Sequence, residues 1–341
     1  MSASLPKTFK KAAFTEKGGR LSIQEAQLEG PAKGEVLVKV EACGVCHSDS
    51  FVKYNAYGVG YPLTPGHEII GRVAALGEGV DGWNVGDRIG GGWHGGHDGI
   101  CGSCKKSLFQ MCSNKAINGV TRNGGYAEYV NLRAESGVRI PEGIDAAEYA
   151  PQLCAGVTVF NSIRQQGVGA GETVAIEGLG GLGHLGVQFA NKFGYHTVAI
   201  SRGADKEKFA RELGAHDYID STQGPPGEAL QKLGGAALIV TTNPHGDKIP
   251  ELLDGLGPKG KLLILSVHGD IPFNVTKLVA KGLSITSWPS GHATDSEDTI
   301  RFVQLENIKC MIEKFPLEKA NEAYDAMMDG KVRFRAVISF E

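Results

Sequence analysis

Apolar and polar positions follow one pattern in the first part of the chain and another after about residue 157. Before that point, runs at 35–42, 69–77 and 124–132 lie between glycine-rich turns and predict β-strands. After it, short apolar runs alternate with stretches in which apolar residues recur at helical spacing. The chain therefore predicts a strand-rich region followed by a series of βα units.

The second region predicts a parallel sheet with helices on both faces, because successive parallel strands need crossover connections. Strands are predicted at 173–178, 196–201, 217–220, 236–242, 261–267 and 283–288, and helices at 181–194, 205–214, 227–234 and 247–257. The stretch 294–328 is polar and helical in character, and 332–340 alternates like a strand. The predicted fold class is α/β, with a β-rich domain beside a doubly wound parallel sheet.

Composition narrows the class of protein. A length of 341 residues suggests two domains, and a net charge of −3 gives no basic footprint for nucleic acid. The first residues lack the apolar core of a secretory signal, and no run of about 18 apolar residues predicts a membrane span. We therefore expect a cytoplasmic protein, in which 7 locally clustered cysteines favour metal binding over disulfides.

A glycine-rich turn predicts a dinucleotide site. Gly178-x-Gly180-x-x-Gly183, with Gly181 and Leu182 inside it, follows a predicted strand and opens a predicted helix. Glycines let the backbone approach a pyrophosphate, and the helix N-terminus offers N–H groups to the phosphates.

The end of the next strand bears on the choice of cofactor. Ser201 and Arg202 stand where an acidic residue would bind a ribose 2′-hydroxyl, and Lys206 is a second cation nearby. A guanidinium suits a 2′-phosphate, so the loop favours NADP(H) over NAD(H). Asp205 is interpreted as the N-cap of the following helix.

The stretch 42–49, ACGVCHSD, fits three kinds of chemistry. Cys43-x-x-Cys46-His47 matches a c-type haem attachment site, and the same two cysteines match a redox pair. In the third interpretation Cys46 binds a metal and Cys43 packs in the core. The absence of an export signal weakens the haem interpretation.

Two groups of residues suggest zinc. Cys46, His67 and Cys154 would make a Cys₂His set of the catalytic kind, although spacing alone does not show that they converge. Cys101, Cys104 and Cys112 lie in one loop and need a fourth ligand. Asp98 stands three residues before Cys101, as Cys101 stands three before Cys104, so it is the favoured fourth ligand. His97 is the alternative.

Taken together, these motifs resemble the zinc-dependent medium-chain alcohol dehydrogenases. The resemblance runs over nearly the whole chain and includes CGVCHSD, PGHEIIGRV, GGYAEY, CAGVT, GLGGLGHLG and FRAVISF, in the family's order. It implies a GroES-like catalytic domain at 1–155, completed by 296–341, and a Rossmann domain at 156–295. It also implies two zinc ions per chain, a nicotinamide cofactor, and a homodimer or homotetramer.

The resemblance assigns roles residue by residue. It implies that the catalytic zinc is bound by Cys46, His67 and Cys154, with Glu68 behind it, Asp49 orienting the histidine and Ser48 taking the alcohol proton. The cofactor would meet His47, Thr158 and Arg335, the last near the pyrophosphate. Trp93 and Trp288 would line an apolar substrate pocket, together with Phe51. The structural zinc would be held by Asp98, Cys101, Cys104 and Cys112.

Three positions depart from the family pattern. Asp98 replaces a cysteine, Phe51 replaces a histidine that ends the proton relay, and Ser201-Arg202 replaces the acidic residue of NAD-preferring members. The expected reaction is the interconversion of a small-molecule alcohol and its aldehyde or ketone by hydride transfer. The alternative is a non-catalytic protein that binds NADPH and zinc and turns over no alcohol. The apolar pocket favours primary, medium-sized or aromatic alcohols.

Overall fold

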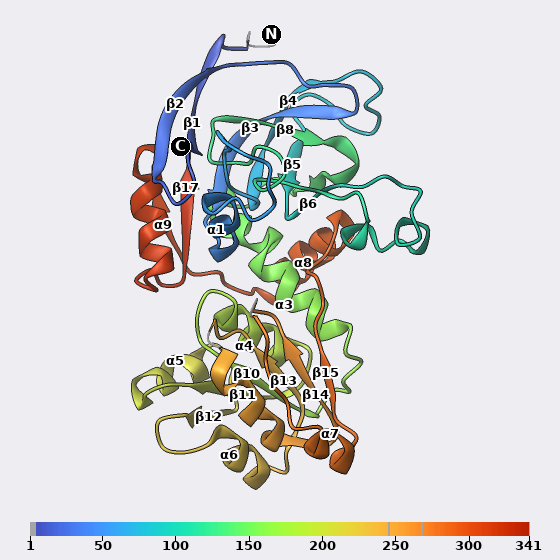
Figure 1. Ribbon diagram of the computed structural model, residues 1–341, viewed down its shortest axis with the longest axis vertical. Helices are drawn as coiled ribbons and strands as arrows, with labels where there is room; N and C mark the ends of the chain where they lie inside the picture. The colour runs from blue at the N-terminus through green and yellow to red at the C-terminus, as the bar shows by residue number, and fades with distance from the viewer. Residues whose placement is uncertain (1–4, 245, 267–268, 341) are drawn as a thin grey trace. The chain divides into compact units, whose positions relative to one another are not determined.

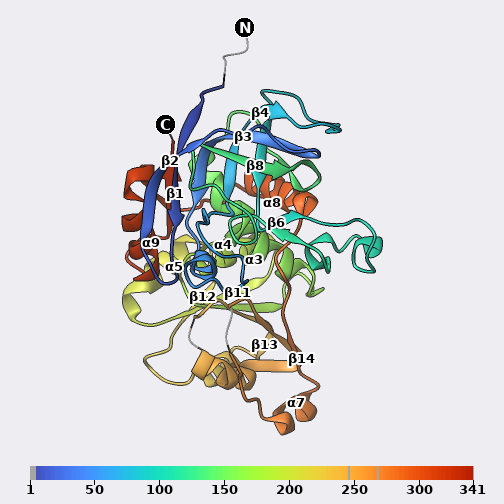
Figure 2. The same cartoon turned by 45° about the horizontal axis from the view of Figure 1, so that its top comes forward.

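The computed structural model describes residues 5–244, 246–266 and 269–340, and the chain divides into two compact units. Unit 1 contains residues 1–157, 290–305 and 309–341, and unit 2 contains residues 158–289 and 306–308. Both ends of the chain therefore belong to unit 1 (Figures 1 and 2).

Unit 1 is built on a seven-stranded sheet. Its order is β16-β17-β3-β4-β5-β9, with β8 also paired to β3. The strands are β3 (Glu35–Gly44), β4 (Ile69–Leu76), β5 (Arg88–Gly91), β8 (Tyr129–Arg133), β9 (Val138–Arg139), β16 (Ile312–Phe315) and β17 (Arg335–Ser339). Two further pairs lie beside it: β1 (Thr8–Phe14) with β2 (Leu21–Gln27), and β6 (His94–Gly96) with β7 (Ala116–Ile117).

The end of the chain completes this sheet. Strand β17 pairs antiparallel with β3, and Ile338 lies opposite Cys43. Every residue of β17 is buried or half-buried, and in β3 only Lys39 is exposed, so this part of the sheet is covered on both faces. The paired ends of β3 and β4 carry the segments that form the first cluster described below.

Short helices connect the strands of unit 1. They are η1 (His47–Asp49), α1 (Ser50–Lys53), η2 (Cys104–Lys106), η3 (Phe109–Met111), η4 (Ala134–Ser136), α2 (Ala146–Tyr149), η5 (Ala150–Leu153), α8 (Ala293–Glu306), η8 (Leu317–Lys319) and α9 (Ala320–Met328). The segment between β6 and β7 extends from the unit as a lobe (Figures 1 and 2). Helix α3 (Ala155–Arg164) crosses the boundary between the units.

Unit 2 is a six-stranded sheet in the order β12-β11-β10-β13-β14-β15, and every adjacent pair is parallel. Its strands are β10 (Thr173–Glu177), β11 (His196–Ser201), β12 (Asp217–Asp220), β13 (Ala236–Thr241), β14 (Leu256–Ile264) and β15 (Ser284–Thr286). Its helices are α4 (Gly183–Lys192), η6 (Ala204–Lys206), α5 (Glu207–Glu212), α6 (Pro226–Lys232), η7 (Gly246–Gly255) and α7 (Val275–Lys281). This doubly wound sheet confirms the predicted α/β class.

The structure corrects several predicted elements. Only Tyr129–Arg133 of the stretch 124–132 forms a strand, and 294–328 divides into α8, β16, η8 and α9. The helix predicted at 247–257 is a 3₁₀-helix that contains Pro250, which cannot donate a helical N–H bond. Helix α7 was not predicted, and residue 267 of the predicted strand 261–267 lies outside the described residues.

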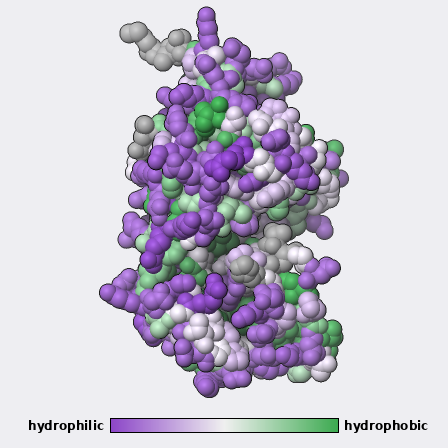
Figure 3. All heavy atoms as spheres, turned by 60° about the vertical axis from the view of Figure 1, so that its left-hand side comes forward, coloured by the Kyte–Doolittle hydropathy of each residue, from purple (hydrophilic) through white to green (hydrophobic). Residues whose placement is uncertain are grey.

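The surface shown in Figure 3 is mostly hydrophilic, with small scattered apolar patches. Among the described residues, no helix combines the length and apolar character that crossing a bilayer requires.

Candidate active site

Four potential metal ligands from three separate segments meet in unit 1. They are Cys46, His67, Glu68 and Cys154, and their donor atoms lie within 4.8 Å of one another. Cys46 caps η1, His67 and Glu68 immediately precede β4, and Cys154 lies between η5 and α3. The structure thus brings together residues whose convergence the sequence spacing alone did not show.

The pairing of β3 with β4 brings the first two of these segments together. Cys43 lies opposite Ile69, so the residues just after β3 and just before β4 come to the same place. Gly44 makes room for the approach, because a Cβ there would lie 1.8 Å from a carboxylate oxygen of Glu68. A side chain at this position would collide with the cluster.

The carboxylate of Asp49 fixes two of the ligand segments. Oδ1 lies 3.2 Å from His67 Nδ1 and accepts a hydrogen bond from Gly66 N at 3.3 Å. Oδ2 accepts from Cys46 N at 3.0 Å and from the hydroxyl of Tyr126 at 2.8 Å. Asp49, His67 and Tyr126 are each fully buried. A buried carboxylate with donors on both oxygens sets the orientation of the imidazole.

The donor atoms suit a metal that binds thiolate and imidazole. The Sγ atoms of Cys46 and Cys154 are 3.8 Å apart, and donation from the Cys154 thiol lowers the pKa of Cys46 while raising that of Cys154. Both ring nitrogens of His67 are buried without a hydrogen bond among the described residues, and Nδ1 faces the Asp49 carboxylate while Nε2 has no such neighbour. Two sulfurs and a bare imidazole nitrogen form the Cys₂His donor set of catalytic zinc, so these residues fit the ion.

Glu68 and Arg335 form a buried ion pair behind the cluster. Glu68 Oε1 contacts Arg335 Nη2, whereas Oε2 is buried without a hydrogen-bond partner among the described residues. Burial raises the pKa of the Glu68 carboxyl, and the Arg335 guanidinium opposes that rise. Arg335 is thus paired with Glu68 in this structure. The predicted role of Arg335 near the cofactor's pyrophosphate stays a prediction.

A row of aromatic rings starts at the ligand histidine. Trp93 meets His67 edge-on at 4.9 Å between ring centroids, Phe51 meets Trp93 at 6.2 Å, and Tyr57 meets Phe51 at 6.0 Å. Exposure rises along the row, from the fully buried His67 to Tyr57, which is 49% exposed. Trp288 lies in unit 2, where its indole nitrogen is buried without a hydrogen-bond partner among the described residues.

A second cluster lies in the lobe between β6 and β7. The donor atoms of Asp98, Cys101, Cys104 and Cys112 lie within 4.8 Å of one another. Three sulfurs and one carboxylate oxygen make a four-ligand set that zinc accepts. The predicted rival, His97, instead stacks between His94 and Phe109, at centroid distances of 5.2 and 4.2 Å.

The glycine-rich turn in unit 2 has a steric reason for each outer glycine. Gly178 has φ +97, and a Cβ at Gly183 would lie 1.7 Å from the carbonyl oxygen of Gly178. A Cβ at Gly180 would meet nothing within 4 Å, so the backbone there is open to a ligand. Gly181 and Leu182 lead directly into α4, whose N-cap residue Leu182 makes no side-chain capping hydrogen bond. Helix N-termini are the backbone feature that binds phosphate.

The loop after β11 brings cations beside Ser201. Lys206 Nζ lies 3.5 Å from Ser201 Oγ, and Arg202 is exposed between them in sequence. The interpretation of Asp205 as an N-cap is wrong, because Asp205 lies inside the 3₁₀ turn η6 and Lys206 caps α5. The loop is closed by the Tyr218 hydroxyl, which donates to Gly203 O at 2.6 Å.

The other predicted residues have simpler surroundings. Cys43 is fully buried in the main apolar cluster of unit 1, which confirms that it packs in the core. His47 is exposed and Ser48 half-buried in the turn η1, and Thr158 lies in α3 within unit 2.

Sequence reasoning missed three residues that contact the predicted sites. Tyr126 contacts Asp49, Tyr57 extends the aromatic row, and Asn114 contacts Asp98. Of these, only Tyr126 could have been found from the sequence. It directly follows the glycine pair 124–125, and the hydroxyl of a buried tyrosine needs a hydrogen-bond partner.

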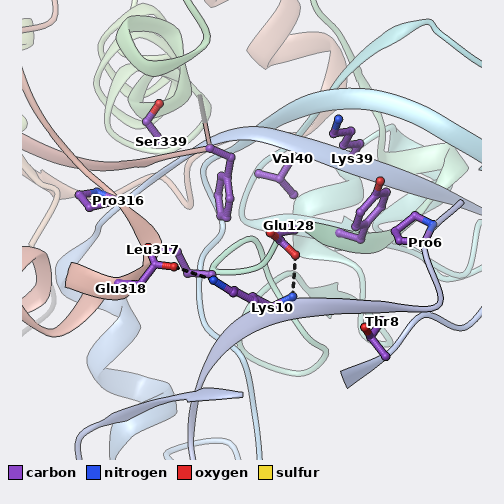
Figure 4. Close-up of a pocket in the computed structure, with 12 residues that line it drawn as sticks. Pro6, Thr8, Lys10, Lys39, Val40, Glu128, Pro316, Leu317, Glu318 and Ser339 are labelled. Carbon is purple, nitrogen blue, oxygen red and sulfur yellow. Dashed lines mark hydrogen bonds and ion pairs between the residues drawn. The ribbon is translucent and has the colours of Figure 1, made fainter. Parts of the chain in front are cut away.

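One pocket of unit 1 is unrelated to these clusters. It has a volume of about 500 Å³ and is lined by residues of β1, β3, β8, η8 and the chain end, including Lys10, Lys39 and Glu318, and by Glu128 just before β8 (Figure 4). Lys10 and Glu318 pair with each other at 3.1 Å, and neither metal cluster contributes to the lining.

Comparisons with known proteins match this architecture. The family model described as the alcohol dehydrogenase GroES-like domain matches residues 32–142, and the zinc-binding dehydrogenase model matches residues 181–305. The alcohol dehydrogenase patD of Penicillium expansum is 61% identical over 339 residues, covering 99% of this chain and 100% of that protein. An alcohol dehydrogenase of Geobacillus stearothermophilus is 32% identical over 345 residues, covering 100% and 99% of the two chains.

The solved structures agree. A cinnamyl alcohol dehydrogenase from Sorghum bicolor has a TM-score of 0.87 and 29% identity, and 98% of each chain is covered. The chain therefore belongs to the zinc-binding, medium-chain alcohol dehydrogenase family, and it is an oxidoreductase of that family.

Proposed function

We propose that this chain interconverts alcohols and aldehydes or ketones with NADP(H), using zinc at Cys46, His67 and Cys154 and a second zinc in the lobe. The observation that carries the metal assignment is the convergence of two sulfurs and a bare, buried imidazole nitrogen in one place. A zinc ion bound there supplies Lewis acidity toward an alcohol or carbonyl oxygen. The nicotinamide supplies the hydride chemistry.

The protein's own residues would prepare and protect this chemistry. The Asp49 carboxylate, 3.2 Å from His67 Nδ1, would orient the ring and leave Nε2 for the metal. We assign to Ser48, half-buried in the same turn as Asp49, the acceptance of the alcohol proton. The side chain of Phe51 can neither accept nor donate a proton. We therefore expect the proton to leave through exposed His47 or through water.

The cofactor preference depends on the loop after β11. The Lys206 ammonium lies over the Ser201 hydroxyl, and neither group would pair with a ribose 2′-hydroxyl as a carboxylate does. The carboxylate of Asp220, on the neighbouring strand, uses its Oδ1 to hold the loop and accepts hydrogen bonds there from Gly203 N and Thr222 N. The hydroxyl of Ser201 and the cations of Arg202 and Lys206 at the end of β11 favour a 2′-phosphate.

Steady-state kinetics with both cofactors test this preference. We expect a higher kcat/KM for NADPH than for NADH, and a roughly 10- to 100-fold loss with NADPH alone in Arg202→Ala and Lys206→Ala, because each substitution removes a hydrogen bond to a charged group. Lys208→Ala is the matched control, because that side chain is 90% exposed on α5. A preference for NADH, or equal losses with both cofactors, would contradict the assignment.

The substrate class and assembly complete the proposal. The row from Trp93 to Tyr57 favours alcohols with a flat apolar or aromatic body. We also expect a homodimer or homotetramer in the cytoplasm, which light scattering and cell fractionation would test.

A further inference from the structure

The Asp98 carboxylate is held at both oxygens. Oδ1 accepts hydrogen bonds from Ile100 N at 2.9 Å and Cys101 N at 3.0 Å, which shapes the turn that carries Cys101. Oδ2 accepts from the side-chain amide of Asn114 at 2.7 Å. One oxygen is therefore fixed by the local backbone, and the other is fixed by a side chain 16 positions away.

Asn114 contacts two of the four donor residues of the lobe. Its backbone N–H donates to Cys112 Sγ at 3.3 Å, while its side chain donates to Asp98. Asp98 N also donates to the Cys112 sulfur, at 3.4 Å. The backbone and side chain of Asn114 thus hold the aspartate and Cys112 in a fixed relation to each other.

The aspartate needs such support more than a cysteine would. Three thiolates repel a carboxylate, and Asp98 is only half-buried, so its carboxylate could turn toward water. The terminal torsion of aspartate is broad and roughly two-fold, so its own rotamer preference does not prevent that rotation. A neutral amide donor restrains the carboxylate without adding charge to the site.

We propose that Asn114 is a positioning residue that keeps the Asp98 carboxylate turned toward Cys101, Cys104 and Cys112 as the fourth ligand of the lobe metal. The inference rests on the proposed metal site in the lobe. It predicts that metal retention there depends on the Asn114 amide, and that the dependence acts through Asp98.

The test measures zinc release from the lobe. In the Cys46→Ser background, which disables the other cluster, we expect Asn114→Ala to release zinc to a chromogenic chelator about tenfold faster. Loss of an outer partner costs roughly 10- to 100-fold in metal affinity, and the exposure of Asn114 places it at the low end. Asn84→Ala is the matched control, an exposed asparagine for which the described structure shows no side-chain hydrogen bond.

A double-mutant cycle separates positioning from general loosening of the loop. In Asp98→Cys the fourth ligand is a thiolate that does not need the amide, so adding Asn114→Ala should leave the release rate unchanged. An equal acceleration in both backgrounds, or none from Asn114→Ala alone, would overturn the inference. If Asp98→Cys does not fold, Asn114→Asp decides, because it keeps the shape but removes the donor and should release zinc at least as fast as Asn114→Ala.

The same measurement distinguishes failure of the Asn114 proposal from failure of the proposed function. A Cys46→Ser protein that holds no zinc at all would remove the lobe metal, and the positioning role with it. The alcohol oxidation assigned to the other cluster would stand or fall separately, by turnover of the unmodified chain.

Discussion

Replacement of Tyr126 by phenylalanine tests the buried network behind the first cluster. The substitution removes one hydroxyl and leaves the ring in place, so Asp49 Oδ2 loses its 2.8 Å donor and keeps only Cys46 N. Burial raises the pKa of Tyr126 well above its ordinary value, so the hydroxyl is a protonated donor across the physiological range. A hydrogen bond to a charged group contributes about 1.5–3 kcal/mol.

We therefore expect Tyr126→Phe to lower the free energy of unfolding of unit 1 by about 2 kcal/mol. For a unit of this size, that corresponds to a fall of about 4–8 °C in melting temperature. We also expect zinc to leave the Cys46 cluster roughly 10- to 100-fold faster, because Asp49 orients His67. Calorimetry and chelator-induced metal release measure the two effects.

Tyr61→Phe is the matched control for this experiment. The Tyr61 hydroxyl donates only to the neutral backbone carbonyls of Val52 and Lys53, so its loss should cost about 1 kcal/mol and leave metal release unchanged. Wild-type release kinetics in Tyr126→Phe, with stability within about 0.5 kcal/mol of wild type, would refute the reasoning.

Three further predictions concern other parts of the chain. Burial lowers the pKa of His94 to about 3, whereas the unfolded chain binds a proton at this residue below about pH 6.5. The free energy of unfolding should therefore fall by up to about 2 kcal/mol between about pH 7.5 and about pH 5. Denaturant titrations of His94→Asn should lack this contribution to the pH dependence of stability. Gly183→Ala should destabilise unit 2 by at least about 3 kcal/mol, because the added Cβ would collide with the backbone. Gly180→Ala should be near neutral in thermal melts, because its Cβ would meet nothing within 4 Å. Equal effects of the two substitutions would contradict the steric account. Tyr57→Ala should lower kcat/KM for an aromatic alcohol more than for a short aliphatic one, and an equal loss on both would remove Tyr57 from the substrate site.

The parallel sheet could be predicted because its strands are buried on both faces and read as short apolar runs between helical stretches. Helix α7 has only 7 residues, so its apolar positions Val275, Leu278 and Val279 were too few to indicate a helix, and the structure leaves Val275 and Val279 66% and 77% exposed. Its ends did carry signals, since Asn274 caps it through Thr276 N and Gly282 closes it in the left-handed region. Local capping chemistry was the better guide there.

The candidate sites were predictable to different depths. The lobe ligands lie within 15 residues, so their spacing already suggested a cluster, which the structure groups with Asp98. Cys46, His67 and Cys154 are far apart in sequence, and only strand pairing brings them together. Contacts such as Tyr126 with Asp49 span 77 positions and depend on tertiary packing, which a single sequence does not reveal.

Metal content per chain, measured by elemental analysis on the wild type and on Cys46→Ala, tests the central claim most directly. The account predicts two zinc ions in the wild type and one in the variant, with alcohol oxidation lost. Zinc content that does not change in Cys46→Ala, with activity retained, would contradict the assignment of the Cys46, His67 and Cys154 cluster as the catalytic metal site.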